Sequence, residues 1–143
     1  MNAQRSHQNG QALVLLVLSM VVLLGFTALA VDGGMVYSDR RHAQMASDAS
    51  SLAGGSAAAM TMENKLVTYT NYNCSSAAIS EAKSKAATAA ISRAADNDYS
   101  IDNDISDNHG VTVTCGVENK GGWDDKYIDI ETNITRETTT AFT

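Results

Sequence analysis

The feature that most constrains this chain is an uncharged run from Gln11 to Val31, in which the only polar side chains are Gln11, Ser19 and Thr27. As a helix with a rise of about 1.5 Å per residue, the run would span roughly 31 Å, close to the ~30 Å hydrocarbon thickness of a bilayer. A core helix of a soluble protein seldom stays apolar on every side over such a length. The run therefore predicts a hydrophobic anchor helix.

The segments on either side of this run indicate its orientation. Residues 1–10 form a short polar leader with Arg5 as its fixed charge, which favours the cytoplasmic side, although Arg40 and Arg41 beyond the run oppose this. Both cysteines of the chain lie beyond the run, and two thiols can pair in an oxidising compartment. We therefore expect residues 32–143 to be extracytoplasmic. A cleaved secretory signal is the alternative, because Ala28-Leu29-Ala30 fits a small-x-small cleavage site.

The periodicity of the remaining chain predicts an α+β fold. One helix is expected over about 11–60, with Met45, Ala46, Leu52 and Met60 on one face. Residues 61–73 are expected to form a loop with a short strand at Leu66–Thr70. A second helix follows over about 75–96, capped by Ser75 or Ser76, and packs on a small antiparallel sheet over about 110–135.

The two cysteines are placed to join these elements. Cys115 alternates in phase with the valines of the first expected strand and so faces inward, while Cys74 stands at the head of the second helix. We therefore expect a disulfide between Cys74 and Cys115. Such a bond would help a domain whose core is built from small side chains.

An acidic stretch between the second helix and the sheet has two interpretations. Its oxygen-bearing side chains are spaced like those of a calcium loop, although Ile101 stands where an EF-hand needs glycine. The other interpretation is a solvated acidic connection, or a short half-buried strand around Tyr99, Ile101 and Ile105. The weak calcium candidates are Asp96, Asp98, Asp102 and Asp104.

The order and spacing of residues 10–54 resemble a known family. The sequence Gln11-Ala12-Leu13-Val14 opens the apolar run, Ala30-Val31-Asp32-Gly33-Gly34 closes it, and Tyr37, Arg40-Arg41, Gln44 and Ala46–Gly54 follow. This pattern is similar to the N-terminal signature of the TadE/TadG-like proteins of tight-adherence (Flp-type) pili. The resemblance implies a membrane-inserted, pilin-like component of a bacterial surface pilus or secretion system. We expect it to be inserted in the inner membrane through its N-terminal helix and then to be extracellular, in a cell-surface pilus.

The first ten residues suggest a processed leader, because they are short, polar and basic and end in Gly10 directly before the apolar run. Residues 1–10 look like a type IV prepilin leader that is cut between Gly10 and Gln11. Leu15 takes the fifth place after this cut, where pilins usually have glutamate. Whether the leader is removed stays open.

We expect the apolar helix, residues 11–31, to be the assembly element, because its surface can be buried only by lipid or by other helices. Small residues near its end would allow close approach of a neighbouring helix. The expected assembly residues are Leu13, Leu16, Val21, Leu24, Gly25, Ala28, Asp32 and Gly34. The expected inter-subunit charges are Asp32, Arg40, Arg41 and Asp48, with an ordinary solvated helix face as the alternative.

Composition narrows the function. The net charge is −6 without a basic patch, which argues against nucleic-acid binding. No catalytic motif is recognisable, so we expect neither an enzyme nor a cofactor. Two functions remain: a structural subunit that polymerises with its own copies or other pilus subunits, or a membrane-anchored minor assembly factor or binding module that does not polymerise. The membrane would be the partner before assembly.

Overall fold

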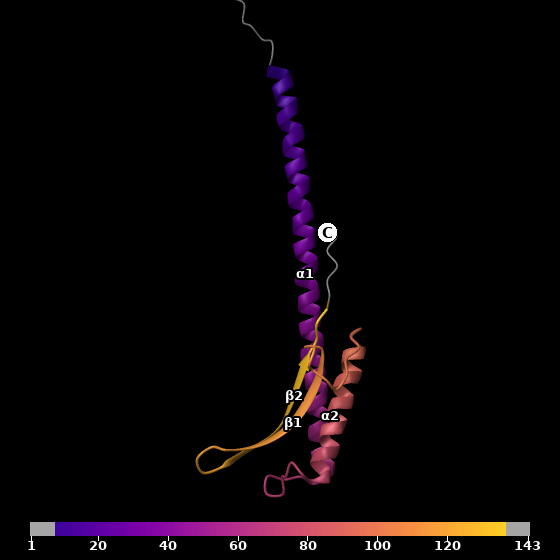
Figure 1. Ribbon diagram of the computed structural model, residues 1–143, viewed down its shortest axis with the longest axis vertical. Helices are drawn as coiled ribbons and strands as arrows, with labels where there is room; N and C mark the ends of the chain where they lie inside the picture. The colour runs from indigo at the N-terminus through magenta and orange to yellow at the C-terminus, as the bar shows by residue number, and fades with distance from the viewer. Residues whose placement is uncertain (1–7, 137–143) are drawn as a thin grey trace, which may run out of the picture. The chain divides into compact units, whose positions relative to one another are not determined.

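The structure is a computed structural model that describes residues 8–136. It contains helices α1 (Gln8–Asn64) and α2 (Ala77–Ala95) and strands β1 (Gly110–Asn119) and β2 (Asp124–Asn133) (Figure 1). The two strands form a two-stranded antiparallel sheet. The predicted α+β fold is therefore confirmed, with the first helix ending at Asn64.

The chain divides into two compact units, and α1 contributes to both. The described part of the first unit is residues 8–39, all of it α1. The described part of the second unit is residues 40–136, which hold the remainder of α1 together with α2, β1 and β2. The expected leader falls mostly outside the described residues, which begin within it at Gln8.

Small residues build the helix packing of the second unit. The buried stripe of α2 contains one large side chain, Ile79, and otherwise only alanines. Gly54 of α1 faces this stripe: a β-carbon there would lie 3.1 Å from the Ala86 carbonyl oxygen and 3.5 Å from Cβ of Ala90. Figure 1 shows α2 alongside the last part of α1. The contacts at Gly54 show that small residues are what allow this close approach.

The start of α2 follows from its cap. The Ser76 side chain accepts a hydrogen bond from the Ile79 backbone N–H at 3.3 Å, which satisfies one of the free donors of the first turn. This confirms the N-cap expected from the sequence.

The β-hairpin covers the helices with one face. In the antiparallel register Val111, Val113 and Cys115 stand opposite Thr132, Ile130 and Ile128. Val111 and Thr132 are buried, and the Ser47 hydroxyl of α1 donates a hydrogen bond to the Thr132 carbonyl. The buried cluster of this unit consists of Ala43, Ala46, Ala90, Ala94, Tyr99, Ile101 and Val111.

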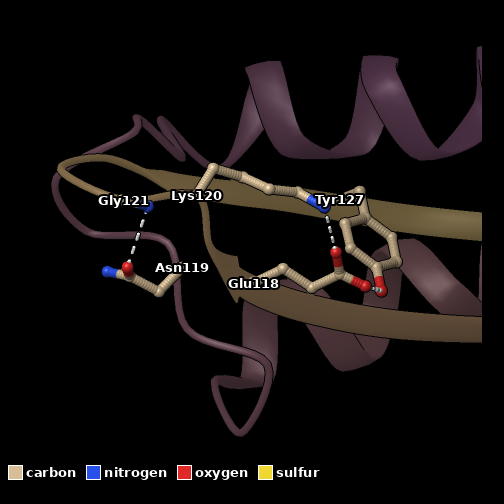
Figure 2. A network of polar contacts seen from close by, with 5 residues as sticks. All are labelled: Glu118, Asn119, Lys120, Gly121 and Tyr127. Atoms are coloured by element: carbon tan, nitrogen blue, oxygen red, sulfur yellow. Dashed lines mark hydrogen bonds and ion pairs between the residues drawn. The ribbon is translucent and has the colours of Figure 1, made fainter.

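The outer face of the hairpin is polar. Around Glu118, Figure 2 shows a Lys120 ammonium that donates to one carboxylate oxygen at 2.6 Å and a Tyr127 hydroxyl that donates to the other at 3.0 Å. These contacts, led by the Lys120 hydrogen bond and followed by that of Tyr127, lower the pKa of the Glu118 carboxyl. Gly121 and Gly122 form the turn with positive φ angles of 76° and 133°, which favour glycine.

The strand predicted at Leu66–Thr70 was wrong, and the short strand that was one interpretation of the acidic connection is not observed. Residues 66–70 form turns and coil rather than a strand, and Asn71 organises them by bonding the Thr68 N–H and the Leu66 carbonyl. The acidic connection also has no strand, yet Tyr99 and Ile101 are buried in the core. The Tyr99 hydroxyl lies 3.1 Å from Nδ1 of His42 in α1, so this connection is held against the helix.

The disulfide expected from the sequence is present. Cys74 and Cys115 are bonded with their Cα atoms 5.7 Å apart, which joins the chain just before α2 to β1. The Tyr72 hydroxyl lies 3.1 Å from Sγ of Cys115 and donates to the Tyr127 carbonyl at 2.5 Å. Burial is the main cause of the raised pKa of Tyr72.

Candidate assembly surface

The apolar segment of α1 is exposed in the single chain. Leu24 and Phe26 are each 66% exposed, and nearly every other side chain of residues 11–31 is also exposed. The most apolar part of the helix has a mean hydropathy of 2.8. Among the described residues, α1 is the one helix whose length and composition suit a membrane span. A surface of this size and polarity needs lipid or other protein to cover it.

The two hydroxyls within this segment are already paired in the helix. Ser19 donates to the Leu16 carbonyl at 2.8 Å, and Thr27 donates to the Leu23 carbonyl at 2.8 Å. A hydroxyl that bonds its own backbone brings no unpaired donor into an apolar environment. The segment is therefore chemically apolar around its circumference despite these two residues.

The glycines in and after this segment leave open space beside the helix. A β-carbon at Gly25, Gly33 or Gly34 would meet nothing within 4 Å. In the described part of the chain, no contact therefore requires glycine at these positions. Glycine in a helix interior costs up to about 1 kcal/mol relative to alanine. The presence of glycine at these three positions therefore needs an explanation outside the contacts of the described chain.

Asp32 is the acidic residue that ends the apolar segment. The residue is half-buried, and its Oδ1 atom is enclosed without a hydrogen-bond donor among the residues that the structure describes. An enclosed carboxylate oxygen without a donor is costly. Oδ1 of Asp32 is therefore an unsatisfied acceptor directly after the apolar segment.

The charged residues expected at a subunit contact are exposed in the second unit. Arg40, Arg41 and Asp48 all lie on α1 with exposed side chains. Within residues 8–136, the ion pairs join Lys65 to Glu81, Arg93 to Asp96 and Lys120 to Glu118, and none of them uses the three α1 residues. These three side chains are therefore accessible to an external partner.

The face of α1 that carries the large apolar residues is not its buried face in the second unit. The buried stripe consists of small residues, Ala43, Ala46, Ser50, Gly54 and Ala58. Met45, Leu52 and Met60 are exposed, Leu52 at 75%. The close approach of α2 and β2 leaves room only for small side chains, so the large ones point outward. They give the second unit an exposed apolar surface of its own.

The acidic connection does not gather into a metal site. The Asp102 and Asp104 carboxylates accept from the backbone N–H groups of Asp104 and Ser106, each at 2.9 Å, and so act as turn acceptors. Asp96 contacts Arg93 at 3.4 Å. Across residues 8–136 no three His, Cys, Asp or Glu side chains are grouped to hold a metal ion. The structure therefore lends no support to the calcium interpretation.

Comparison with known proteins agrees with the character of this surface. Residues 10–59 match the model of a family described as "Putative Flp pilus-assembly TadE/G-like". The match confirms the resemblance to TadE/TadG-like proteins and covers the apolar segment together with the small-residue stripe. No curated protein and no solved structure matches the chain. Residues 10–59 are thus similar to a pilus-assembly family, and the apolar segment of α1 lies within the matched range.

Proposed function

We propose that this protein is a structural, pilin-like subunit of an extracellular filament of the tight-adherence type, assembled through α1. The observation that carries the proposal is the exposed apolar segment of residues 11–31, whose hydroxyls are satisfied by its own backbone. The family match at residues 10–59 supports a pilus context. In this proposal residues 11–31 sit in the inner membrane before assembly and in the filament core afterwards.

Close helix packing explains the small residues of the segment. Ala28 and Gly34 would let a neighbouring α1 approach, and Leu13, Leu16, Val21 and Leu24 would interdigitate around Gly25. The open space beside Gly25 and Gly34 in the described chain supports an intermolecular role for them.

The charges would set the register of neighbouring copies. We assign the missing donor of Asp32 to Arg40 or Arg41 of an adjacent copy, and Asp48 to the same set of inter-subunit contacts. The enclosed, donor-free Oδ1 of Asp32 in the described chain and the exposed arginines support this assignment.

The apolar segment of α1 is also compatible with a second function. Its length and composition suit lipid as well as a helix bundle. In that case the protein is a minor assembly factor that stays anchored, and the acidic second unit binds other pilus components. Cleavage of the leader between Gly10 and Gln11 is part of the filament proposal and not of this second function.

Gly34→Leu separates the two functions. The variant keeps the segment apolar, and its side chain meets open space within the described chain, so membrane insertion and folding of the second unit should be unchanged. If α1 packs against neighbouring copies, filaments recovered by shearing should be lost or reduced at least about tenfold, because overpacking a close helix contact costs about 1–3 kcal/mol at every repeat.

Leu66→Ala is the control for this experiment. Leu66 is 78% exposed in the loop after α1, so its truncation should leave both insertion and filament yield unchanged. Normal filaments from the Gly34→Leu protein would contradict close packing of α1 and favour the anchored assembly factor.

A further inference from the structure

The two edges of the hairpin differ in how their backbone groups are used. Successive residues of an antiparallel pair alternately face the partner strand and the free edge. The Lys120 N–H donates to the Trp123 carbonyl at 2.9 Å across the hairpin, whereas the Val111 N–H donates away from β2, to the Asp102 carbonyl at 2.8 Å. Odd-numbered residues of β1 therefore point their backbone groups to the free edge.

The outer edge of β2 is covered at both ends. The Thr132 carbonyl accepts from the Ser47 hydroxyl. At the other end the Tyr69 hydroxyl accepts from the Asp124 N–H and donates to the Asp124 carbonyl, each at 3.0 Å. Lys126 adds a hydrogen bond to the Tyr69 carbonyl at 2.8 Å.

The β1 edge is left open beyond its first residues. Within the described chain, the backbone groups of Val113, Cys115 and Val117 that point away from β2 have no hydrogen-bond partner. The strand has a continuous register without a bulge, no charged side chain between Val111 and Val117, and no proline. It therefore lacks the bulges, charges and prolines that often block pairing at a strand edge.

A groove lies beside the start of this edge. It has a volume of about 330 Å³ and lies between α2 and β1, with Lys83, Thr88, Asn103 and Val113 among its lining residues. The groove places a lysine and two hydrogen-bonding side chains next to the open backbone groups. An extended peptide fits such a surface, because its own backbone supplies the matching donors and acceptors.

We propose that the β1 edge takes the C-terminal segment, residues 137–143, of a second copy as an added strand. This inference rests on the proposed function, which brings copies side by side. The segment, Glu-Thr-Thr-Thr-Ala-Phe-Thr, is rich in threonine and has one phenylalanine, residue types enriched in strands. At about 3.3 Å per residue, seven residues span roughly 23 Å, the length of β1 from Val113 to Asn119.

The geometry at the end of β2 favours a second copy over the same chain. The Thr135 N–H donates to Nδ1 of His109 at 3.2 Å, so the described chain ends beside the start of β1. Running along its own β1 edge would require an immediate reversal of direction. In a neighbouring copy, a parallel orientation would bring Glu137 near Lys83 in the groove, which pairs opposite charges.

Amide hydrogen exchange tests this docking directly, without filaments. The protein is the chain shortened after Arg136, in detergent micelles, and the probe is a peptide of residues 137–143. The amides of Val113, Cys115 and Val117 should exchange at least about tenfold more slowly with the peptide. Thr112 and Thr114, whose amides face β2, serve as internal controls and should not change.

Two proline peptides test whether backbone pairing is responsible. In an added strand, the backbone N–H groups of alternate residues point to β1, and proline has no N–H to donate. One peptide carries proline in place of Thr139 and the other in place of Thr140. One of these peptides should lose the protection and the other should keep it. No protection by the native peptide, or equal protection by both proline peptides, would overturn the proposal.

The same exchange measurement on the full chain, at decreasing protein concentration, gives one further outcome. Protection of these three amides that persists unchanged on dilution would show that a chain covers its own edge, which also overturns docking of a second copy. Neither result depends on filament formation, so failure of the docking is distinguishable from failure of the proposed function.

Discussion

Gly54 is the residue on which the packing of the second unit depends most closely. A β-carbon there would lie 3.1 Å from both the Ala86 carbonyl oxygen and Cγ2 of Ile130. In the sequence, Gly54 and Gly55 are indistinguishable as a pair of helix-weakening residues. Only the positions of α2 and β2 show that Gly54 leaves little room for a side chain.

Gly54→Ala should therefore destabilise the second unit by about 1–3 kcal/mol, because the carbonyl and the isoleucine must move. Gly55→Ala is the matched control. Its β-carbon would have one neighbour, Ile130 Cδ1 at 3.9 Å, so the better helix propensity of alanine should stabilise the protein by up to about 1 kcal/mol. Urea unfolding of the two variants checks this, and equal effects would contradict the packing described for Gly54.

Glu118 gives the hairpin a small dependence on pH. Its pKa is lowered first by the Lys120 hydrogen bond and then by that of Tyr127. The stabilising contribution is complete above the pKa of the unfolded carboxyl and is lost as pH falls through the lower folded pKa. Because the carboxylate is exposed, salt should also weaken this contribution.

Glu118→Gln should consequently have a lower melting temperature than the unaltered protein at neutral pH, and the difference should shrink in acid and at high salt. Asp129→Asn is a control, because the Asp129 carboxylate has no hydrogen bond in the described residues, and it should not show this pattern. A melting-temperature difference for Glu118→Gln that is independent of pH would contradict the two hydrogen bonds of the carboxylate as its cause.

At the scale of the elements, the sequence predicted α1, α2 and the hairpin because each has a clear period and recognisable ends. The face of α1 marked by its large apolar residues is not the one that packs in the second unit. The buried stripe is formed by alanine, serine and glycine, and only the closeness of α2 and β2 excludes larger side chains. Asn71 likewise organises residues 66–70 through side-chain bonds that no periodicity reveals.

The disulfide is the link between elements that the sequence located correctly. It closes a loop with a sequence separation of 41 residues between the start of α2 and β1. In the chain-entropy model, loss of such a link costs on the order of 3–4 kcal/mol. Cys74→Ser with Cys115→Ser should lower the free energy of unfolding by about this amount, measured by urea denaturation.

Mass analysis after alkylation without reduction provides the accompanying check. The exported protein should show no alkylated cysteine, and only prior reduction should expose Cys74 and Cys115 to the reagent. Alkylation of both residues in the unreduced protein would contradict the bond.

At the scale of the whole molecule, different stretches of one chain have different tasks. Residues 11–31 present an apolar surface that no other described segment covers, while residues 40–136 fold around small side chains and a disulfide. The long apolar helix could be predicted from the sequence alone, because its length and lack of charge leave few alternatives. The open β1 edge could not, since it depends on which backbone groups the fold leaves unpaired.

The central claim is that this chain is built into a filament through α1. The most direct measurement is electron microscopy of filaments sheared from the cell surface, with antibody labelling of residues 40–136 and mass analysis of the N-terminus. We expect label along the filaments and a mature chain that begins at Gln11. Filaments that carry no label, with the chain found only in the membrane fraction, would contradict the claim.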